Sequence, residues 1–225
     1  MNGVKTMMWK DMRYIFRKKL LLYMIGVVVW MVVINAATFT KGKSPNLGAI
    51  FNLLFLSSTA IIFILGVTFI SGVIFRNERN DFTLPSLLAG PLNIKDIFFA
   101  KFIITFVITY IFTIAFLVFF IIFILYEKTN LPSAQTILTS VITIPIWGFA
   151  IIEIIGLLYL IIGKIQYVQM ITMLLIIFSS MEFLQHPLNL SHFPFLLTFA
   201  GIIIAAFLYF LISKIDKERV MRTLS

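Results

Sequence analysis

Glu153 is the residue whose type and position could most directly do chemistry, because it stands near the middle of an apolar run long enough to cross a membrane. An unpaired carboxylate in hydrocarbon is costly, so this side chain should be protonated or should face a polar partner or a cavity. It could belong to a transport pathway or a coupling element, or it could make a structural hydrogen bond between helices. Glu153 is therefore the candidate intramembrane polar site, with both interpretations open.

Four other ionisable side chains fit less specific roles. Lys101 and Glu182 lie near the ends of their apolar runs, where long side chains can extend to the membrane surface. His186 and His192 lie in a loop that contains prolines, without a cysteine or a cluster of carboxylates beside them. This arrangement does not favour a metal site, and we predict neither a metal nor another cofactor.

The chain also lacks the residue patterns of an enzyme. It has no cysteine, no paired catalytic carboxylates and no arrangement of a nucleophile with a base. A phosphate-binding loop of the form Gly-x-x-x-x-Gly-Lys-Ser/Thr is missing, because Gly163-Lys164 lacks both the spacing and the following hydroxyl residue. We therefore predict no catalytic residues and no ATPase motif in this sequence.

Membrane helices must position these residues, because 61% of the 225 residues are hydrophobic and only 12% are charged. A spanning helix needs about 20 mostly apolar residues. The sequence predicts an all-α membrane protein that forms one transmembrane domain over residues 1–225, with an amphipathic interfacial helix at 1–19, a six-helix membrane domain at 20–213 and a tail at 214–225. The expected transmembrane helices are Leu20–Phe39, Ile50–Phe75, Ile97–Tyr126, Ile137–Ile162, Tyr167–Phe183 and Phe195–Ser213.

The first residues predict an amphipathic helix that lies in the membrane interface. Apolar side chains recur at helical spacing between residues 4 and 16, and basic side chains lie mostly off that stripe. Trp9 and Tyr14 suit the boundary between lipid and water. The apolar stripe consists of Val4, Met8, Met12 and Ile15 or Phe16.

The basic residues predict the orientation of the chain, because short loops rich in Lys and Arg stay in the cytoplasm. With both termini in the cytoplasm, only Lys41, Lys43 and Lys128 fall outside. The net charge of +9 then reflects membrane topology and contact with membrane lipids, and we predict no binding to nucleic acid. The expected cytoplasmic set is Lys5, Lys10, Arg13, Arg17, Lys18, Lys19, Arg76, Arg79, Lys95, Lys101, Lys164, Lys214, Lys217, Arg219 and Arg222.

The longest predicted cytoplasmic connection, residues 76–96, contains residues that typically start and end a short helix. Thr83 can cap its start, and Gly90 followed by Pro91 forms a stop. Asn93 then predicts the start of the next helix. Such a helix, too short to be stable by itself, suits docking into the groove of a partner, although an ordinary interfacial loop helix would fit the same pattern. Its apolar side consists of Leu84, Leu87 and Leu88.

Here the chain resembles the membrane subunits of type-2 ATP-binding cassette (ABC) exporters, whose intracellular loop commonly reads Glu-Arg-x-x-Gly-Thr-Leu-x-x-Leu-Leu-x-x-Pro. Two positions depart from this pattern: Phe82 replaces the usual Gly, and Pro85 stands where Glu is frequent, so the docking geometry could differ. The matching residues are Glu78, Arg79, Thr83, Leu84, Leu87, Leu88 and Pro91.

The resemblance implies that these residues form a coupling helix, which contacts a separate ATPase subunit and transmits ATP-driven motion. It also implies a second permease subunit, identical or different, in the cytoplasmic membrane. The chain is most similar in kind to small Gram-positive exporters of bacteriocins or phenol-soluble modulins, which implies a hydrophobic or amphipathic substrate and favours a peptide.

Three other functions remain open. A haem-export permease could use His186 or His192, and a proton-coupled secondary transporter could use Glu153 as its proton carrier. A membrane immunity or scaffold protein would bind a toxin or lipid without moving it.

Overall fold

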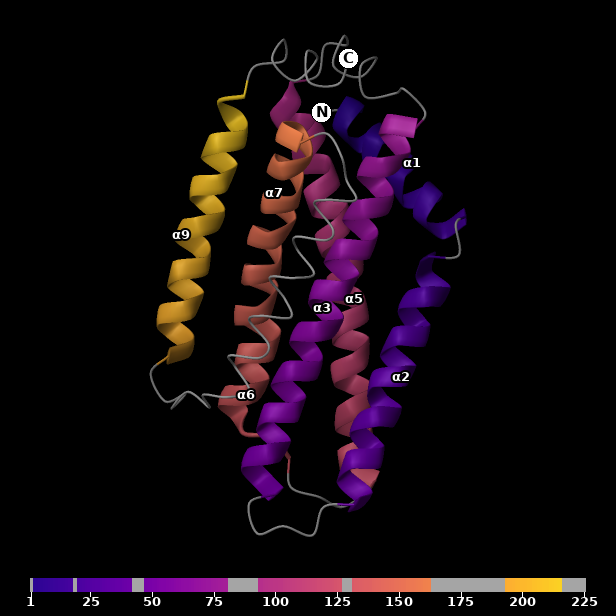
Figure 1. Cartoon of the computed structure of the whole chain (residues 1–225), viewed down its shortest axis with the longest axis vertical. Helices are drawn as coiled ribbons and strands as arrows, with labels where there is room; N and C mark the ends of the chain where they lie inside the picture. The colour runs from indigo at the N-terminus through magenta and orange to yellow at the C-terminus, as the bar shows by residue number, and fades with distance from the viewer. Residues whose placement is uncertain are drawn as a thin grey trace.

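The computed structural model describes residues 2–17, 20–41, 47–80, 93–126, 131–162 and 193–215, and these residues are helical apart from short connections. The long helices lie side by side along one axis, while α1 lies at one end of this bundle (Figure 1). The helices are α1 (Asn2–Arg17), α2 (Leu20–Lys41), α3 (Leu47–Asn80), α5 (Ile94–Tyr126), α6 (Ala134–Leu138), the π-helical turn η1 (Thr139–Thr143), α7 (Ile144–Ile162) and α9 (Phe193–Ser213).

Among the described residues, three helical segments are long and apolar enough to cross a membrane: Leu54–Phe75, Lys95–Tyr126 and Ala134–Leu158. Shorter apolar stretches occupy Leu21–Val33 in α2 and Thr198–Ser213 in α9. These helices cover five of the six expected transmembrane segments, and the remaining one, Tyr167–Phe183, lies outside the described residues. The all-helical membrane architecture is confirmed, whereas the number of six transmembrane helices stays a prediction.

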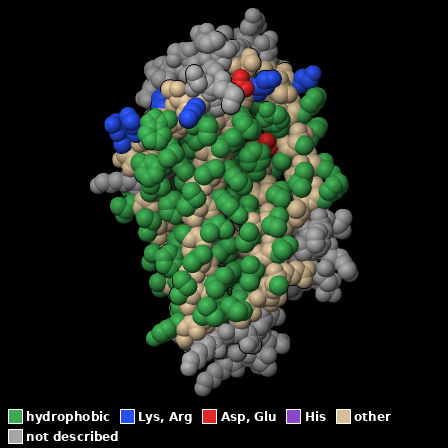
Figure 2. Space-filling view, turned by 180° about the vertical axis from the view of Figure 1, so that it is seen from behind, with side chains coloured by type: hydrophobic (Ala, Val, Ile, Leu, Met, Phe, Trp, Pro, Cys, Tyr) green, Lys and Arg blue, Asp and Glu red, His purple; other side chains and the backbone are tan. Residues whose placement is uncertain are grey.

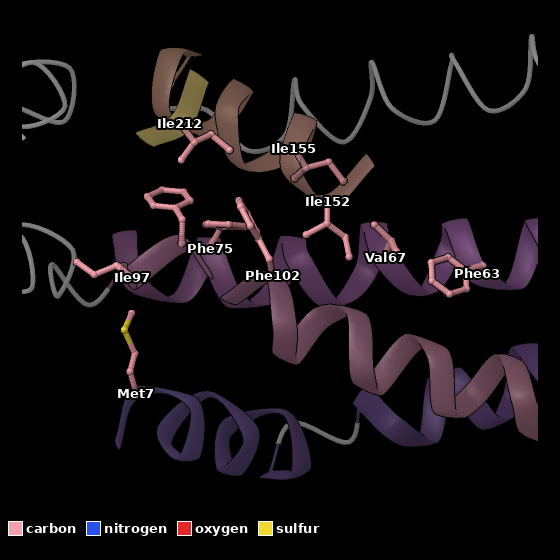
Figure 3. Close-up of a cluster of buried hydrophobic side chains, with 10 residues drawn as sticks. Met7, Phe63, Val67, Phe75, Ile97, Phe102, Ile152, Ile155 and Ile212 are labelled. Carbon is pink, nitrogen blue, oxygen red and sulfur yellow. The ribbon is translucent and has the colours of Figure 1, made fainter. Parts of the chain in front are cut away.

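A core that extends from Met7 of α1 along the bundle to Phe63 of α3 is built largely from aromatic and branched side chains (Figure 3). Phe75 of α3 stacks on Phe98 of α5 with ring centroids 5.5 Å apart, and Phe98 meets Phe102 edge-on at 5.9 Å. Contacts of this kind hold α3 against α5. The cluster consists of Met7, Phe63, Val67, Phe75, Ile97, Phe98, Phe102, Ile152, Ile155 and Ile212.

Two glycines on one face of α7 allow α3 and α5 to approach it closely. A Cβ added to Gly148 would overlap the ring of Phe63, and one added to Gly156 would lie 2.6 Å from the ring of Phe102. Small residues at helix contacts permit this approach in membranes, where packing holds helices together. The glycines therefore let the two aromatic rings fill the space between the helices.

The π-helical turn η1 interrupts the helix that runs from α6 to α7. Pro145 follows it, and because proline has no N–H it cannot donate the usual helical hydrogen bond to the carbonyl of Val141. The hydroxyl of Tyr110 in α5 donates to that carbonyl at 3.4 Å. On the other side, the hydroxyls of Thr143 and Thr198 lie 2.9 Å apart and join η1 to α9. This irregular turn is thus tied to both neighbours.

The helix predicted at the amino terminus is present as α1, but it has two apolar faces. Met12 and Phe16 are exposed, as a stripe directed at lipid requires, and Trp9 is exposed beside them with the guanidinium of Arg13 5.7 Å from its ring. Ile15, which the sequence offered as the alternative to Phe16 in that stripe, is fully buried and packs with residues of α3 and α5. The helix therefore rests on the bundle with one face and leaves the other uncovered.

Candidate functional site

The most distinctive site is an open cleft of about 460 Å³ between α5, α7 and α9. Its lining residues recur at helical spacing on each of the three helices, as one face of each helix requires. α5 contributes Phe99 and Phe106, α7 contributes Ile146, Phe149 and Glu153, and α9 contributes Ile202, Ala205, Ala206 and Tyr209.

Glu153 is the one carboxylic acid among these lining residues. It is 0% exposed, and neither of its carboxylate oxygens has a hydrogen-bond partner among the residues that the structure describes. The preceding residue, Ile152, belongs to the core packed against α3 and α5. Because successive helical residues differ by about 100° in direction, Glu153 lies at the edge of that packed face, on the side of the cleft.

Aromatic side chains form much of the remaining wall. Phe99 and Tyr209 meet across α5 and α9 with ring centroids 6.1 Å apart. Phe106 and Phe149 meet edge-on at 5.6 Å between α5 and α7. The small alanines of α9 leave the space between these rings open, so a buried acid borders an apolar, aromatic cleft.

A second buried polar group joins α1 to α5. The ammonium group of Lys101 lies 3.4 Å from a carboxylate oxygen of Asp11, and their side chains are 0% and 6% exposed. The same ammonium lies 5.5 Å from the ring centroid of Phe75. The expectation that Lys101 extends to the membrane surface was therefore wrong, because a partner from α1 lets its charge stay inside the bundle.

Sequence reasoning missed Asp11 altogether. The signal was present in its spacing, because Asp11 lies four residues after Met7 and four residues before Ile15, both of which are buried. An acid on the buried face of an otherwise basic helix calls for a cation on the helix opposite. That cation is Lys101, which is 90 residues away in the sequence.

The predicted coupling residues lie largely beyond the described part of the chain. Glu78 and Arg79 fall within the last turn of α3, whose backbone is helical to Asn80. The predicted start of the following helix is confirmed, because α5 begins at Ile94, directly after Asn93. Outside the described residues lie Thr83, Leu84, Leu87, Leu88 and Pro91, together with Glu182, His186 and His192. Within the described ranges, no three histidine or acidic side chains group to hold a metal ion.

Comparison with known families identifies the class of protein. Residues 15–180, well over half of the chain, match the family model described as ABC-2 family transporter protein. The chain therefore belongs to the ABC-2 family of transporter proteins. It is a membrane permease component of such a transporter, a multi-pass membrane protein without ATPase activity of its own.

The matched range includes the loop between α3 and α5 and the helix that carries Glu153. The type-2 ABC resemblance is confirmed at the level of this family. The match does not extend to bacteriocins or phenol-soluble modulins, so it does not support that finer assignment. No curated protein and no solved structure is a significant match to the chain.

Proposed function

We propose that this permease component exports a hydrophobic or amphipathic substrate across or out of the cytoplasmic membrane, while a separate subunit hydrolyses ATP. The family match over residues 15–180 carries this proposal, because ABC-2 permeases generally pair with an ATPase subunit. A peptide is the preferred substrate, by resemblance to small peptide exporters. The complex would contain two permease subunits, identical or different, and the ATPase.

The coupling element of this proposal is residues 78–91. α3 continues to Asn80, beyond its apolar segment ending at Phe75, and α5 begins at Ile94. These two helix ends lie at the same end of the bundle as α1 (Figure 1). A connection at that end is well placed to meet a subunit in the cytoplasm, and Glu78 and Arg79 would lead from the membrane helix into the docking segment.

The same end of the bundle is proposed to face the cytoplasm, with both termini there. Lys and Arg side chains gather near it, while hydrophobic side chains cover the length of the visible face (Figure 2). Exposed Lys5 and Lys10 in α1, Lys95 at the start of α5 and Lys214 after α9 belong to this end. Under the positive-inside rule, such an end stays in the cytoplasm.

The proposal is tested by purifying tagged protein from its native membrane in mild detergent and identifying bound chains by mass spectrometry. Leu87→Asp places a charge on the predicted apolar side of the docking helix, so it should release the ATPase subunit, because burying an unpaired charge at an interface is costly. Ser86→Asp adds the same charge on the opposite side of that helix and should retain the subunit. Recovery of intact wild-type permease without any ATPase would contradict the proposal.

A further inference from the structure

We propose that the cleft between α5, α7 and α9 binds the cationic group of an amphipathic substrate, with Glu153 as its counter-ion. This inference rests on the proposed export function and names the chemistry of the substrate. It concerns a molecule with one amine or guanidinium and an apolar body.

The first argument is that one buried acid has no cation beside it among the described residues. Two acidic side chains are buried among the described residues, Asp11 and Glu153. The bundle neutralises Asp11 internally through Lys101, at 3.4 Å. Both oxygens of Glu153 lack a partner in the described ranges, and this residue borders a cleft. A cationic ligand would give Glu153 the neighbouring positive charge that Lys101 gives to Asp11.

The second argument is the chemistry of the walls. Beside Glu153 the cleft is lined by Phe99, Phe106, Phe149 and Tyr209. Aromatic faces attract an ammonium or guanidinium group and also bury hydrocarbon. The bundle already uses this chemistry elsewhere, where Lys101 lies 5.5 Å from the ring of Phe75. Among the described lining side chains, the Tyr209 hydroxyl is the one donor that an anionic ligand would find beside the Glu153 carboxyl group.

The third argument is size and depth. A volume of about 460 Å³ falls within the range of about 300–1,000 Å³ that is typical of sites for small ligands. Glu153 lies nine residues before Ile162, the end of α7, which is about 13 Å along the helix. A cleft of this size beside a buried acid suits a small molecule whose cationic group meets Glu153 and whose apolar body lies against the aromatic rings.

The inference is tested by photolabelling the full chain, with the partners that co-purify, in nanodiscs of phosphatidylglycerol without ATP. The probes are dodecylammonium and dodecanol that carry the same diazirine in the alkyl chain. Dodecylammonium should label lining residues of α5, α7 and α9. Glu153→Gln should reduce this labelling about tenfold or more, as expected for loss of a charge-assisted hydrogen bond, and should leave dodecanol labelling unchanged.

A matched pair of variants tests the location. Ala206 lines the cleft, whereas its near neighbour Ile203 does not line it and is 53% exposed on α9. Ala206→Trp fills the cleft without touching the charge of Glu153 and should also abolish the labelling. Ile203→Trp adds the same bulk on the same helix but outside the cleft, so the labelling should be retained. Equal labelling of both Trp variants would overturn the proposal.

Two further results would each overturn the inference. If Glu153→Gln lowers the melting temperature but not the dodecylammonium labelling, Glu153 makes an internal hydrogen bond and binds no cation. If phosphatidylethanolamine added to the discs displaces the probe, a lipid amine occupies the cleft, and the substrate assignment is wrong. Because labelling requires no ATP, its failure is distinct from failure of the export function, which shows itself as loss of the co-purified ATPase subunit.

Discussion

At the scale of single residues, the two acids that are buried in the described part of the chain have different surroundings. Asp11 is paired with Lys101, so neither charge is left uncompensated. Glu153 has no partner among the described residues and lines a cleft. Removing one member of a buried pair strands the other charge, whereas replacing both together often costs little. The two acids therefore lead to different expectations for substitution.

Lys101→Met should destabilise the protein by about 3–5 kcal/mol, because Asp11 would be buried without a cation. Thermal unfolding in detergent, followed by size-exclusion chromatography, measures the loss. The double variant Asp11→Leu with Lys101→Met should recover most of the stability. A double variant as unstable as Lys101→Met alone would show that the ion pair is not the cause.

At the scale of elements, helix contacts depend on where small residues lie. Gly148 and Gly156 of α7 accept the rings of Phe63 and Phe102. The carbonyl of Val141, which Pro145 cannot satisfy in the usual helical way, accepts a hydrogen bond from Tyr110. Both features act between helices, and they fix how α7 sits against α3 and α5.

Gly148→Ala should lower stability by about 1–3 kcal/mol, because the added methyl group overlaps the buried ring of Phe63. Gly26→Ala is a matched control in α2, since nothing lies within 4 Å of its added Cβ. That control should be neutral or should stabilise the helix by up to about 1 kcal/mol. Thermal unfolding of the two variants side by side checks this, and equal losses would argue against close packing at Gly148.

At the scale of the whole molecule, the described basic side chains lie toward one end of the bundle. α1, the start of α5 and the end of α9 lie together at one end, and α6 lies at the other (Figure 1). The basic side chains in view gather at the first end (Figure 2). This asymmetry predicts that the two ends of the bundle are accessible from opposite sides of the membrane.

Cysteine labelling tests this access directly, because the chain has no cysteine of its own. Leu131→Cys, at an exposed position just before α6, should react with a membrane-impermeant maleimide in intact cells. Lys95→Cys and Lys214→Cys should react only after the cells are opened. A permeant maleimide should label all three in either case. Labelling of Lys95→Cys in intact cells would contradict a cytoplasmic position for this end.

The sequence by itself determined the class of the protein and the positions of most helices. Long apolar runs in a chain of this composition must form membrane helices, because lipid leaves backbone groups no other way to be satisfied. The start of α5 after Asn93 and the ABC-2 resemblance also came from local patterns. The coupling residues of the loop that carries this resemblance stay a prediction, because most of them lie outside the described residues.

Only the tertiary structure decided which faces meet. The pairing of Lys101 with Asp11, the burial of Ile15 and the cleft beside Glu153 all join residues from different helices. The physical reason is that lipid is as apolar as a protein core, so hydrophobic side chains are suitable on either side of a membrane helix. Composition thus places a helix in the membrane, and only its packing against neighbours shows which side faces inward.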